Sequence, residues 1–441
     1  MTAVTTKQKN LVPMMIIAGL FVIFGFVTWI NGALIPFMKT INELTESESY
    51  LVATASYISF VVMALPSSYV IGKIGYKKSI SLGLVIMAIG ALVFIPAAEA
   101  RTYWVFLLAI FLQGAGMTLL QTAANPYITI LGPIESAAKR IAIMGICNKV
   151  AGAVGSIIFG ALLLTGIDEV NEKLSTVSAF EKTELLNTMA NSVVMPYVVM
   201  SLVLVIFAVL IRKAPLPNVE SESEASEDNS SEKTTKTSIF QFPHLWLGVL
   251  ALFVYVGAEV IAGDTIIAYG ISLGFSAAKA KFFTTLTLLF MVVTYGLGAI
   301  LIPKYISQNT ALKASAVLGI VFSLLILNTT GFTSVLFVAA LGISNALVWP
   351  AIWPLTLKGL GKFTKTASAL LVMAISGGAI IPPLYGRMVD ASKLSLISEG
   401  VDQVEATAKA ATGSYWILIP CYAIILFFAL WGHKYKSWFK K

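Results

Sequence analysis

Charge is scarce in this chain. Asp, Glu, Lys and Arg make up only 12% of its 441 residues, whereas 57% are hydrophobic. A soluble domain carries roughly 25% charged residues. So low a charge content excludes an ordinary soluble fold and predicts a polytopic membrane protein.

Cysteine and histidine are almost absent as well. Cys147 and Cys421 lie in separate apolar segments, which excludes a disulfide framework or a cysteine metal site. His244 and His433 stand alone near the ends of apolar segments and make no metal site. The chain also has no phosphate-binding glycine loop and no nucleophile constellation. We therefore expect neither an enzyme nor an ATP-driven pump, and no organic cofactor.

Long apolar runs dominate the remainder of the chain. Because the first run is too long for the hydrophobic core of a signal peptide, we expect it to stay as a membrane span. The sequence predicts an all-α membrane protein with twelve transmembrane helices. They run at about 11–38, 50–72, 79–98, 102–131, 139–165, 192–211, 243–270, 282–303, 311–328, 332–357, 366–389 and 413–432.

The net charge of +8 is explained by topology. If the N-terminus is cytoplasmic, most of the 30 Lys and Arg residues fall on the cytoplasmic side, as the positive-inside rule requires. The acidic loops at 39–49 and 166–190 then lie outside. We expect a protein of the plasma (inner) membrane with both termini cytoplasmic, in contact with lipid and with no nucleic-acid partner.

A polar segment divides the chain in the middle. Residues 215–237 are rich in Ser and Glu and have no apolar periodicity, which predicts a disordered cytoplasmic linker within 212–242. The linker separates an N-terminal half (1–211) from a C-terminal half (243–441), each with six spans. Weak similarity between the halves, with Asn125-Pro126 matching Trp353-Pro354, predicts that they are pseudo-symmetric.

Polar residues interrupt the fourth span. Gln121 and Asn125 lie four apart on one helical face, and Pro126 follows them as a helix breaker. Amides within a bilayer either bond a neighbouring helix or line a wet cavity. In the second case this face would bind a molecule rich in hydroxyl groups.

The tenth span presents a matching stripe. Asn345, Trp349 and Trp353 are spaced four apart. An indole packs well on the C–H face of a sugar ring, and its N–H can donate to a hydroxyl. The alternative is that the tryptophans only pack against lipid or the core. Together, amides from one half and indoles from the other favour a neutral sugar.

Three ionisable side chains lie well inside the spans, where charge is costly and usually functional: Lys149, Glu259 and Asp264. In one interpretation, Glu259 or Asp264 binds sodium together with oxygens such as that of Thr265. In a second, one of the two carboxylates carries a proton. In a third, Lys149 and Glu259 form a standing ion pair and no ion is coupled. Asp264 could also simply meet water at the outer mouth.

Several motifs resemble those of a known family. Six plus six helices with a central linker is the architecture of the major facilitator superfamily. Within it the chain resembles the fucose, galactose and glucose permeases. The resemblance is carried by WINGALIPFM (29–38), LQTAANPYITILGP (120–133) and SGGAIIPPLYGRMVD (376–390). It implies sugar transport by alternating access.

Two departures from the family pattern affect coupling. The chain has Asn31-Gly32 where proton-coupled members have Asn-Asp, and Gln121-Thr122 where they have Glu-Thr. Neither replacement can titrate. For this reason we favour sodium over a proton as the coupling cation, with a possible sodium site at Glu259 or Asp264.

The function expected from the sequence is cation-coupled import of a neutral monosaccharide of the glucose, galactose or fructose type. The alternatives are an uncoupled sugar facilitator or an exporter of hydrophilic solutes, and, more distantly, a sugar receptor that does not transport. We expect a monomer. The predicted ion-coupling residues are Glu259, Asp264 and Thr265; the predicted sugar-binding residues are Asn31, Gln121, Asn125, Asn148, Lys149, Glu259, Asn345, Trp349 and Trp353.

Overall fold

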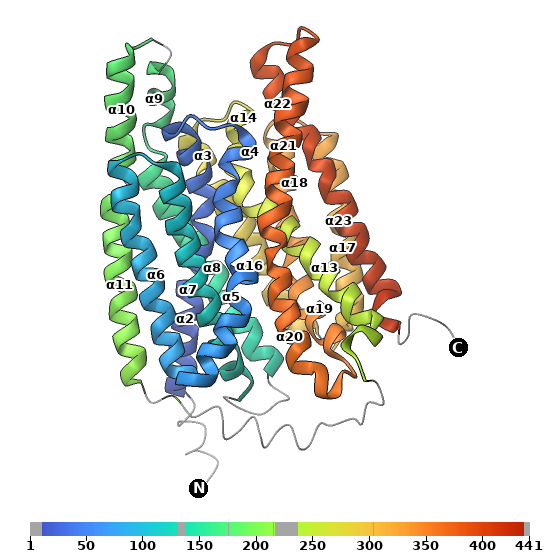
Figure 1. Cartoon of the computed structure of the whole chain (residues 1–441). Coiled ribbons are helices and arrows are strands. Elements are labelled where there is room, and N and C mark those ends of the chain that lie inside the picture. The colour runs from blue at the N-terminus through green and yellow to red at the C-terminus, as the bar shows by residue number, and fades with distance from the viewer. Residues whose placement is uncertain are drawn as a thin grey trace.

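The computed structural model describes residues 11–130, 137–174, 176–214, 216, 237–302 and 304–435. Within these ranges every regular element is helical, and the helices run side by side in one bundle (Figure 1). Twelve helices are long and apolar enough to cross a membrane. The all-α, twelve-span prediction is confirmed.

The first half supplies spans one to six. Its helices are α2 (Leu11–Trp29), α3 (Asn31–Ile41), α4 (Glu46–Ser49), α5 (Leu51–Ile74), α6 (Tyr76–Glu99), α7 (Tyr103–Ile130), α8 (Ala137–Leu163), α9 (Ile167–Lys173), α10 (Ala179–Asn191) and α11 (Val194–Lys213).

The second half supplies spans seven to twelve. Its helices are η2 (Ile239–Gln241), α13 (Pro243–Val260), the π-helical η3 (Ile261–Thr265), α14 (Ile266–Ser272), α15 (Ala277–Ala280), α16 (Phe283–Leu301), α17 (Gln308–Leu327), α18 (Gly331–Ala346), α19 (Val348–Leu357), η4 (Gly361–Phe363), α20 (Thr364–Met373), η5 (Ala374–Ser376), α21 (Gly377–Ser398), α22 (Gln403–Ser414), η6 (Tyr415–Ile417), α23 (Leu418–Leu430) and η7 (Gly432–Lys434).

Small residues let these helices approach closely. A Cβ on Gly83 of α6 would lie 2.7 Å from the carbonyl oxygen of Gly116 in α7, and a Cβ on Gly116 would lie 2.4 Å from that of Gly83. Between apolar helices in lipid, van der Waals packing of this kind replaces the hydrophobic driving force. It holds α7, the helix of the predicted amide face, firmly against α6.

Several spans are discontinuous. Span one breaks at Ile30, span seven contains the π-helix η3, span ten breaks at Leu347, and span eleven contains η5. Pro126 was expected to break span four, but α7 continues through it to Ile130. Discontinuous helices in transporters are found where substrate or ions bind, because the interrupted backbone leaves polar groups available.

The segments between spans contain more helix than the sequence indicated. The predicted acidic loop at 166–190 forms α9 and most of α10, and 403–414 forms α22. Figure 1 shows α9, α10 and α22 projecting from the same end of the bundle. We call it the far end; the linker end is the opposite one, where α11 ends and α13 begins. The linker prediction stays a prediction, since most of 215–237 lies outside the described residues.

Two aspartates join the halves at the far end. Asp390 of α21 accepts hydrogen bonds from the backbone N–H groups of Glu46 (3.1 Å) and Ser47 (2.8 Å), which begin α4. Asp168 of α9 accepts from the N–H of Ala277, which begins α15, at 3.1 and 2.9 Å to its two oxygens. A carboxylate at a helix start satisfies unpaired N–H groups and meets the positive end of the helix dipole.

These two contacts, the far-end caps, are related by the pseudo-symmetry. Asp390 lies in the far-end part of span eleven and Asp168 in α9, at the far end of span five, while α4 and α15 follow spans one and seven. In each case a carboxylate of one half caps a helix of the other. The ring contact between Tyr50 and Tyr385, with centroids 5.7 Å apart, lies beside the first cap. The far end is therefore closed in this structure.

We predict that replacing both cap carboxylates, Asp168→Asn with Asp390→Asn, opens the far end more often. Each charged cap stabilises the closed arrangement by about 1 kcal/mol, so losing two shifts the population roughly tenfold or more. Spin labels on the exposed positions Phe180 and Leu394 would report a longer distance. Asp402→Asn is the matched control, because Asp402 caps its own helix at Val404 within one half. Equal distances in both variants would contradict the role of the caps.

Candidate functional site

A buried ion pair joins the two halves near the middle of the bundle. Lys149 Nζ of α8 lies 2.9 Å from Glu259 Oε1 of α13, and the two side chains are only 9% and 14% exposed. The ammonium also stands 4.2 Å from the centre of the Trp29 ring, in cation–π range. One of the three sequence interpretations placed these two residues together, and the structure does so.

Aromatic hydroxyl groups surround the carboxylate of this pair. Glu259 interacts with the side chains of Tyr255 and Tyr295, both of which are buried. Tyr422 interacts with Tyr255 and donates a hydrogen bond to Asn345 Oδ1 at 2.8 Å. A polar network thus reaches from Lys149 in the first half to Asn345 in the tenth span.

Asp264 lies five residues beyond Glu259, inside the π-helical segment. It has no exposed surface, and neither of its carboxylate oxygens has a hydrogen-bond partner among the described residues. The nearby amide of Asn31 is close enough to interact with it, yet Asn31 Nδ2 is also buried without a hydrogen bond. Asp264 therefore does not lie in water at an outer mouth, and that expectation is wrong.

Glycines bring α3 and the π-helix together. A Cβ on Gly263 would lie 2.1 Å from Trp29 Cζ3, and a Cβ on Gly32 would lie 3.3 Å from the Gly263 carbonyl oxygen. Gly32, which stands where proton-coupled relatives of the predicted family have Asp, is thus packed next to the residue that precedes Asp264. The first half closes directly over the π-helix.

Threonines satisfy the carbonyl groups that the π-helix leaves free. Thr284 Oγ1 donates to Gly263 O at 2.6 Å, and Thr287 Oγ1 donates to Ala262 O at 3.2 Å. Thr265 Oγ1 donates to Ile261 O at 2.7 Å and lies 3.0 Å from the Tyr415 hydroxyl. The hydroxyl of Thr265 is therefore not bonded to Asp264, although the sequence placed both in one ion site.

The amides of the first half have different surroundings. Gln121 is partly exposed and makes no hydrogen bond within the described residues; it lies one turn after Met117, whose sulfur contacts Thr28 Oγ1 at 3.5 Å. The side chain of Asn125 lies outside the part that the structure describes. Asn148 Nδ2 donates to Phe21 O of α2 at 3.5 Å, a long interhelical bond. Of Gln121 and Asn148, whose side chains are described, Asn148 shows the helix-bonding role expected of amides in lipid.

The stripe on span ten is present but divided. Asn345 ends α18 fully buried, with Nδ2 unpaired, whereas Trp349 and Trp353 lie on α19 beyond the break at Leu347. The two indoles are partly buried and stacked, with ring centres 5.3 Å apart and planes at 29°. They are available as an aromatic surface, while Asn345 is held by Tyr422.

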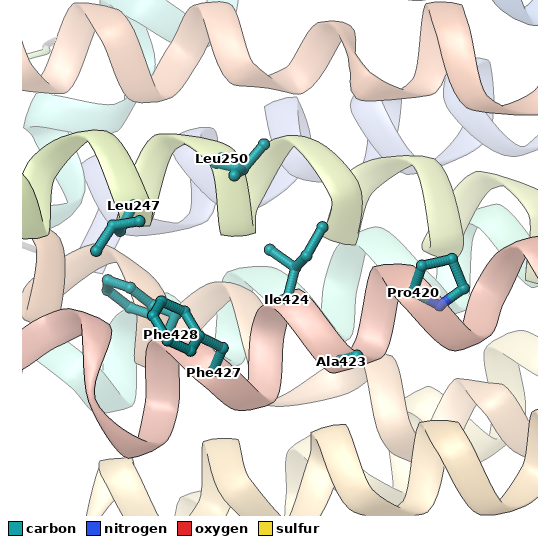
Figure 2. A pocket seen from close by; sticks show the side chains of 7 residues that line it. All are labelled: Leu247, Leu250, Pro420, Ala423, Ile424, Phe427 and Phe428. Carbon is teal, nitrogen blue, oxygen red and sulfur yellow. The ribbon is translucent and has the colours of Figure 1, made fainter.

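One apolar groove lies away from this cluster. Figure 2 shows it between α13 and α23, lined by Leu247, Leu250, Pro420, Ala423, Ile424, Phe427 and Phe428. Leu250 and Phe427 are also exposed on the surface. With no polar side chain, the groove cannot satisfy sugar hydroxyl groups, and it is not the predicted site.

Sequence reasoning gave Trp29, Tyr295 and Tyr422 little or no weight. Trp29 and Tyr295 belong to one buried cluster with Ala346, and Trp29 carries the cation–π contact. Their only sequence signal was an aromatic ring in an apolar span, which is usual for packing. The described residues contain no group of three or more His, Cys, Asp or Glu that could hold a metal ion.

The comparisons with known proteins agree with this architecture. A family model described as Major Facilitator Superfamily matches residues 17–383. The chain belongs to the Major Facilitator Superfamily. Its elongated bundle of two six-helix halves is the fold of that superfamily, and the recognition made from the sequence is confirmed.

Similar members of the superfamily have known names. The glucose/galactose transporter of Brucella abortus is 32% identical over 98% of this chain and 96% of the relative. The L-fucose-proton symporter of Escherichia coli is 27% identical over 88% and 89%. Because the relatives are transporters or symporters, the prediction that the chain is not an enzyme is confirmed.

Solved structures show the same fold. A crystal structure of the superfamily transporter FucP, in the outward conformation, aligns with a TM-score of 0.69, at 25% identity over 96% of this chain and 99% of FucP. A D-xylose-proton symporter aligns with a TM-score of 0.66 at 15% identity, over 96% of each chain. The second comparison supports the fold alone.

We predict that replacing one member of the central ion pair lowers the stability of the protein more than expected from replacing both members together. Lys149→Met or Glu259→Gln alone should destabilise the protein by about 3 kcal/mol or more, because each leaves a buried charge unpaired. The double variant should lose less than the sum of the two. Thermal unfolding in detergent would measure all three.

The control for this cycle is Lys409 with Glu405, a pair 2.7 Å apart and more than half exposed. The same substitutions there should cost less than about 1 kcal/mol. Additive losses at Lys149 and Glu259 would show that the two charges do not depend on each other.

Proposed function

We propose that this protein is a secondary active transporter of a neutral monosaccharide, which works by alternating access and couples uptake to a cation. The observation that carries the proposal is the polar cluster between the halves, where the Lys149–Glu259 pair meets Trp29 and buried tyrosines. Similarity to glucose/galactose transporters along nearly the whole chain supports a hexose as substrate.

The charges of the cluster favour a neutral substrate. Lys149 and Glu259 neutralise each other at 2.9 Å. An anionic sugar acid would need a cation that is free to pair with it, because a buried charge is tolerated only when it is compensated. Sugar hydroxyl groups need only hydrogen-bond donors and acceptors, which amides supply.

Gln121 is the strongest candidate for direct sugar contact, since the residue is partly exposed and its side chain makes no hydrogen bond within the described residues. Trp349 and Trp353 would face the apolar side of the ring, and Asn125 would extend the amide face. Asn31 and Asn345 are buried, and the Asn148 amide donates to Phe21 O; in this proposal the three contact sugar only after the halves move, together with Lys149 and Glu259.

The coupling ion is better explained as a proton than as sodium. The sequence favoured sodium, with ligands near Asp264, Thr265 and main-chain carbonyls. In the structure the Gly263 carbonyl accepts from Thr284 and the Thr265 hydroxyl faces Tyr415. A hard cation needs several free oxygen ligands around it, and these hydrogen bonds compete with a sodium ion for the oxygens that the sequence assigned to it. Relatives whose names state a coupling ion are proton symporters.

Three alternatives remain as outcomes of experiment. An uncoupled facilitator or an exporter would use the same fold without concentrating sugar in the cell. A receptor would bind sugar and transport none. We further propose that the protein acts as a monomer in the inner membrane, with both termini in the cytoplasm.

Transport in proteoliposomes tests the proposal. We predict counterflow of labelled hexose, and accumulation driven by an inward proton gradient at zero sodium. Binding without counterflow would identify a receptor, and counterflow without accumulation would identify a facilitator. If accumulation responds to an inward sodium gradient at fixed pH but not to a proton gradient, the coupling ion is sodium.

We predict that Gln121→Ala weakens hexose binding by tenfold or more, because roughly 1.5 kcal/mol is lost when one good hydrogen bond to a bound ligand is removed. Titration of purified protein with hexose measures this. Gln403→Ala, an exposed amide at the far end, is the matched control and should bind as the parent does. Unchanged affinity in Gln121→Ala would remove this residue from the site.

A further inference from the structure

The carboxyl group of Asp264 is held in surroundings that an anion cannot easily occupy. Its exposure is 0%, and both oxygens lack a hydrogen bond within the described residues. Desolvating an unpaired carboxylate is costly, and the group takes up a proton or a partner instead. Lys149 is not that partner, since its ammonium is bonded to Glu259.

The groups that face Asp264 come from several elements. Glu259 of α13 repels a second negative charge, Lys149 of α8 attracts it but is already paired, and Asn31 of α3 offers an amide. Tyr57 of α5 interacts with Asp264 as well. The local charge is therefore balanced without Asp264, and a charged Asp264 would leave one net negative charge between the halves.

Asp264 lies where the two halves touch. It belongs to the second half, while Asn31, Gly32 and Trp29 belong to the first. Trp29 packs against Gly263, and Gly32 approaches the Gly263 carbonyl. Residues of the first half thus help to bury Asp264 in this structure, in which the halves are closed over the π-helix.

We propose that Asp264 is the carboxyl group that carries the coupling proton, and that closure of α3 and Trp29 over the π-helix is the event that loads it. The inference rests on the proposed proton-coupled transport and names the group responsible. In contact with water on one side, the carboxylate takes a proton from a hydronium ion and leaves water, and closure then buries the neutral acid. When the halves separate toward the opposite side, the acid returns the proton to water there and becomes the anion again, so that one proton crosses in each cycle.

The same arrangement assigns a different part to Glu259. Its carboxylate is bonded to the Lys149 ammonium across the halves. Glu259 therefore positions the network around the sugar, and Asp264 exchanges the proton. In this proposal the closed arrangement binds the proton more tightly than the open one. By thermodynamic linkage, protonation therefore stabilises the closed arrangement.

The test compares two kinds of transport in one set of proteoliposomes. Asp264→Asn replaces the acid with an amide of the same size that cannot titrate. We expect loss of proton-driven accumulation with counterflow of labelled hexose retained, and counterflow that no longer varies with pH. Asp402→Asn, an acid-to-amide change at the far end, should keep both accumulation and the pH dependence.

The outcomes separate this inference from the proposed function. If the parent protein shows no hexose counterflow, the transport proposal itself fails. If the parent accumulates hexose with protons and Asp264→Asn still does so, transport stands and the role of Asp264 is overturned. A role in packing alone would lower stability and counterflow together, without removing the pH dependence of whatever counterflow remains.

A measurement on the parent protein covers the case in which Asp264→Asn does not fold. A hydrophobic carbodiimide reacts with protonated carboxyl groups in apolar surroundings, and mass spectrometry locates the adduct. We expect modification at Asp264 that decreases as the pH is raised, and no modification of Glu259. Modification of Glu259 instead of Asp264 would overturn the inference.

Discussion

The pairing of Lys149 with Glu259 ties together the two halves of the bundle. Removing two charges from water is costly, and their attraction repays the cost only while the geometry is good. The pair lies 2.9 Å apart between spans five and seven and is covered by Trp29. Aromatic hydroxyl groups, the Asn345 amide and the approach of α3 to the π-helix are all arranged around this compensated centre.

The closed far end also depends on carboxylates of one half that are compensated by groups of the other half, but these contacts are weaker. The caps by Asp168 and Asp390 place one carboxylate of each half on a helix start of the other. They are nearer to water than the central pair, so each contributes less and can break more easily. Two weak, symmetric contacts and one stronger central pair suit a molecule that must leave its closed state repeatedly without losing its fold.

The two carboxylates of span seven differ in whether a nearby cation neutralises their charge. Glu259 has a cation within bonding distance, whereas Asp264 has only a nearby amide and no hydrogen bond among the described residues. Their positions differ by five residues, and a π-helix lies between the regular helices on either side of Asp264. This difference in surroundings is the reason that we assign the proton-carrying role to Asp264 and a positioning role to Glu259.

The sequence by itself determined the twelve spans, the two halves and the superfamily, because the length and polarity of a bilayer restrict which segments can cross it. It also selected Lys149, Glu259 and Asp264, since charge within a span is rare enough to stand out. It did not foresee the helices α9, α10 and α22, whose polar residues resemble loops in a search for apolar runs.

Only the tertiary structure decided which of these side chains meet. Whether Lys149 pairs with Glu259 or Asp264 depends on how α8 packs against span seven, and the π-helix changes the direction of the side chains beyond Glu259. Likewise, Asn345 was expected to face sugar with the tryptophans, but the break at Leu347 leaves it bonded to Tyr422. Helical spacing predicts which residues share a face, whereas the partner of that face is set by contacts between residues far apart in the chain.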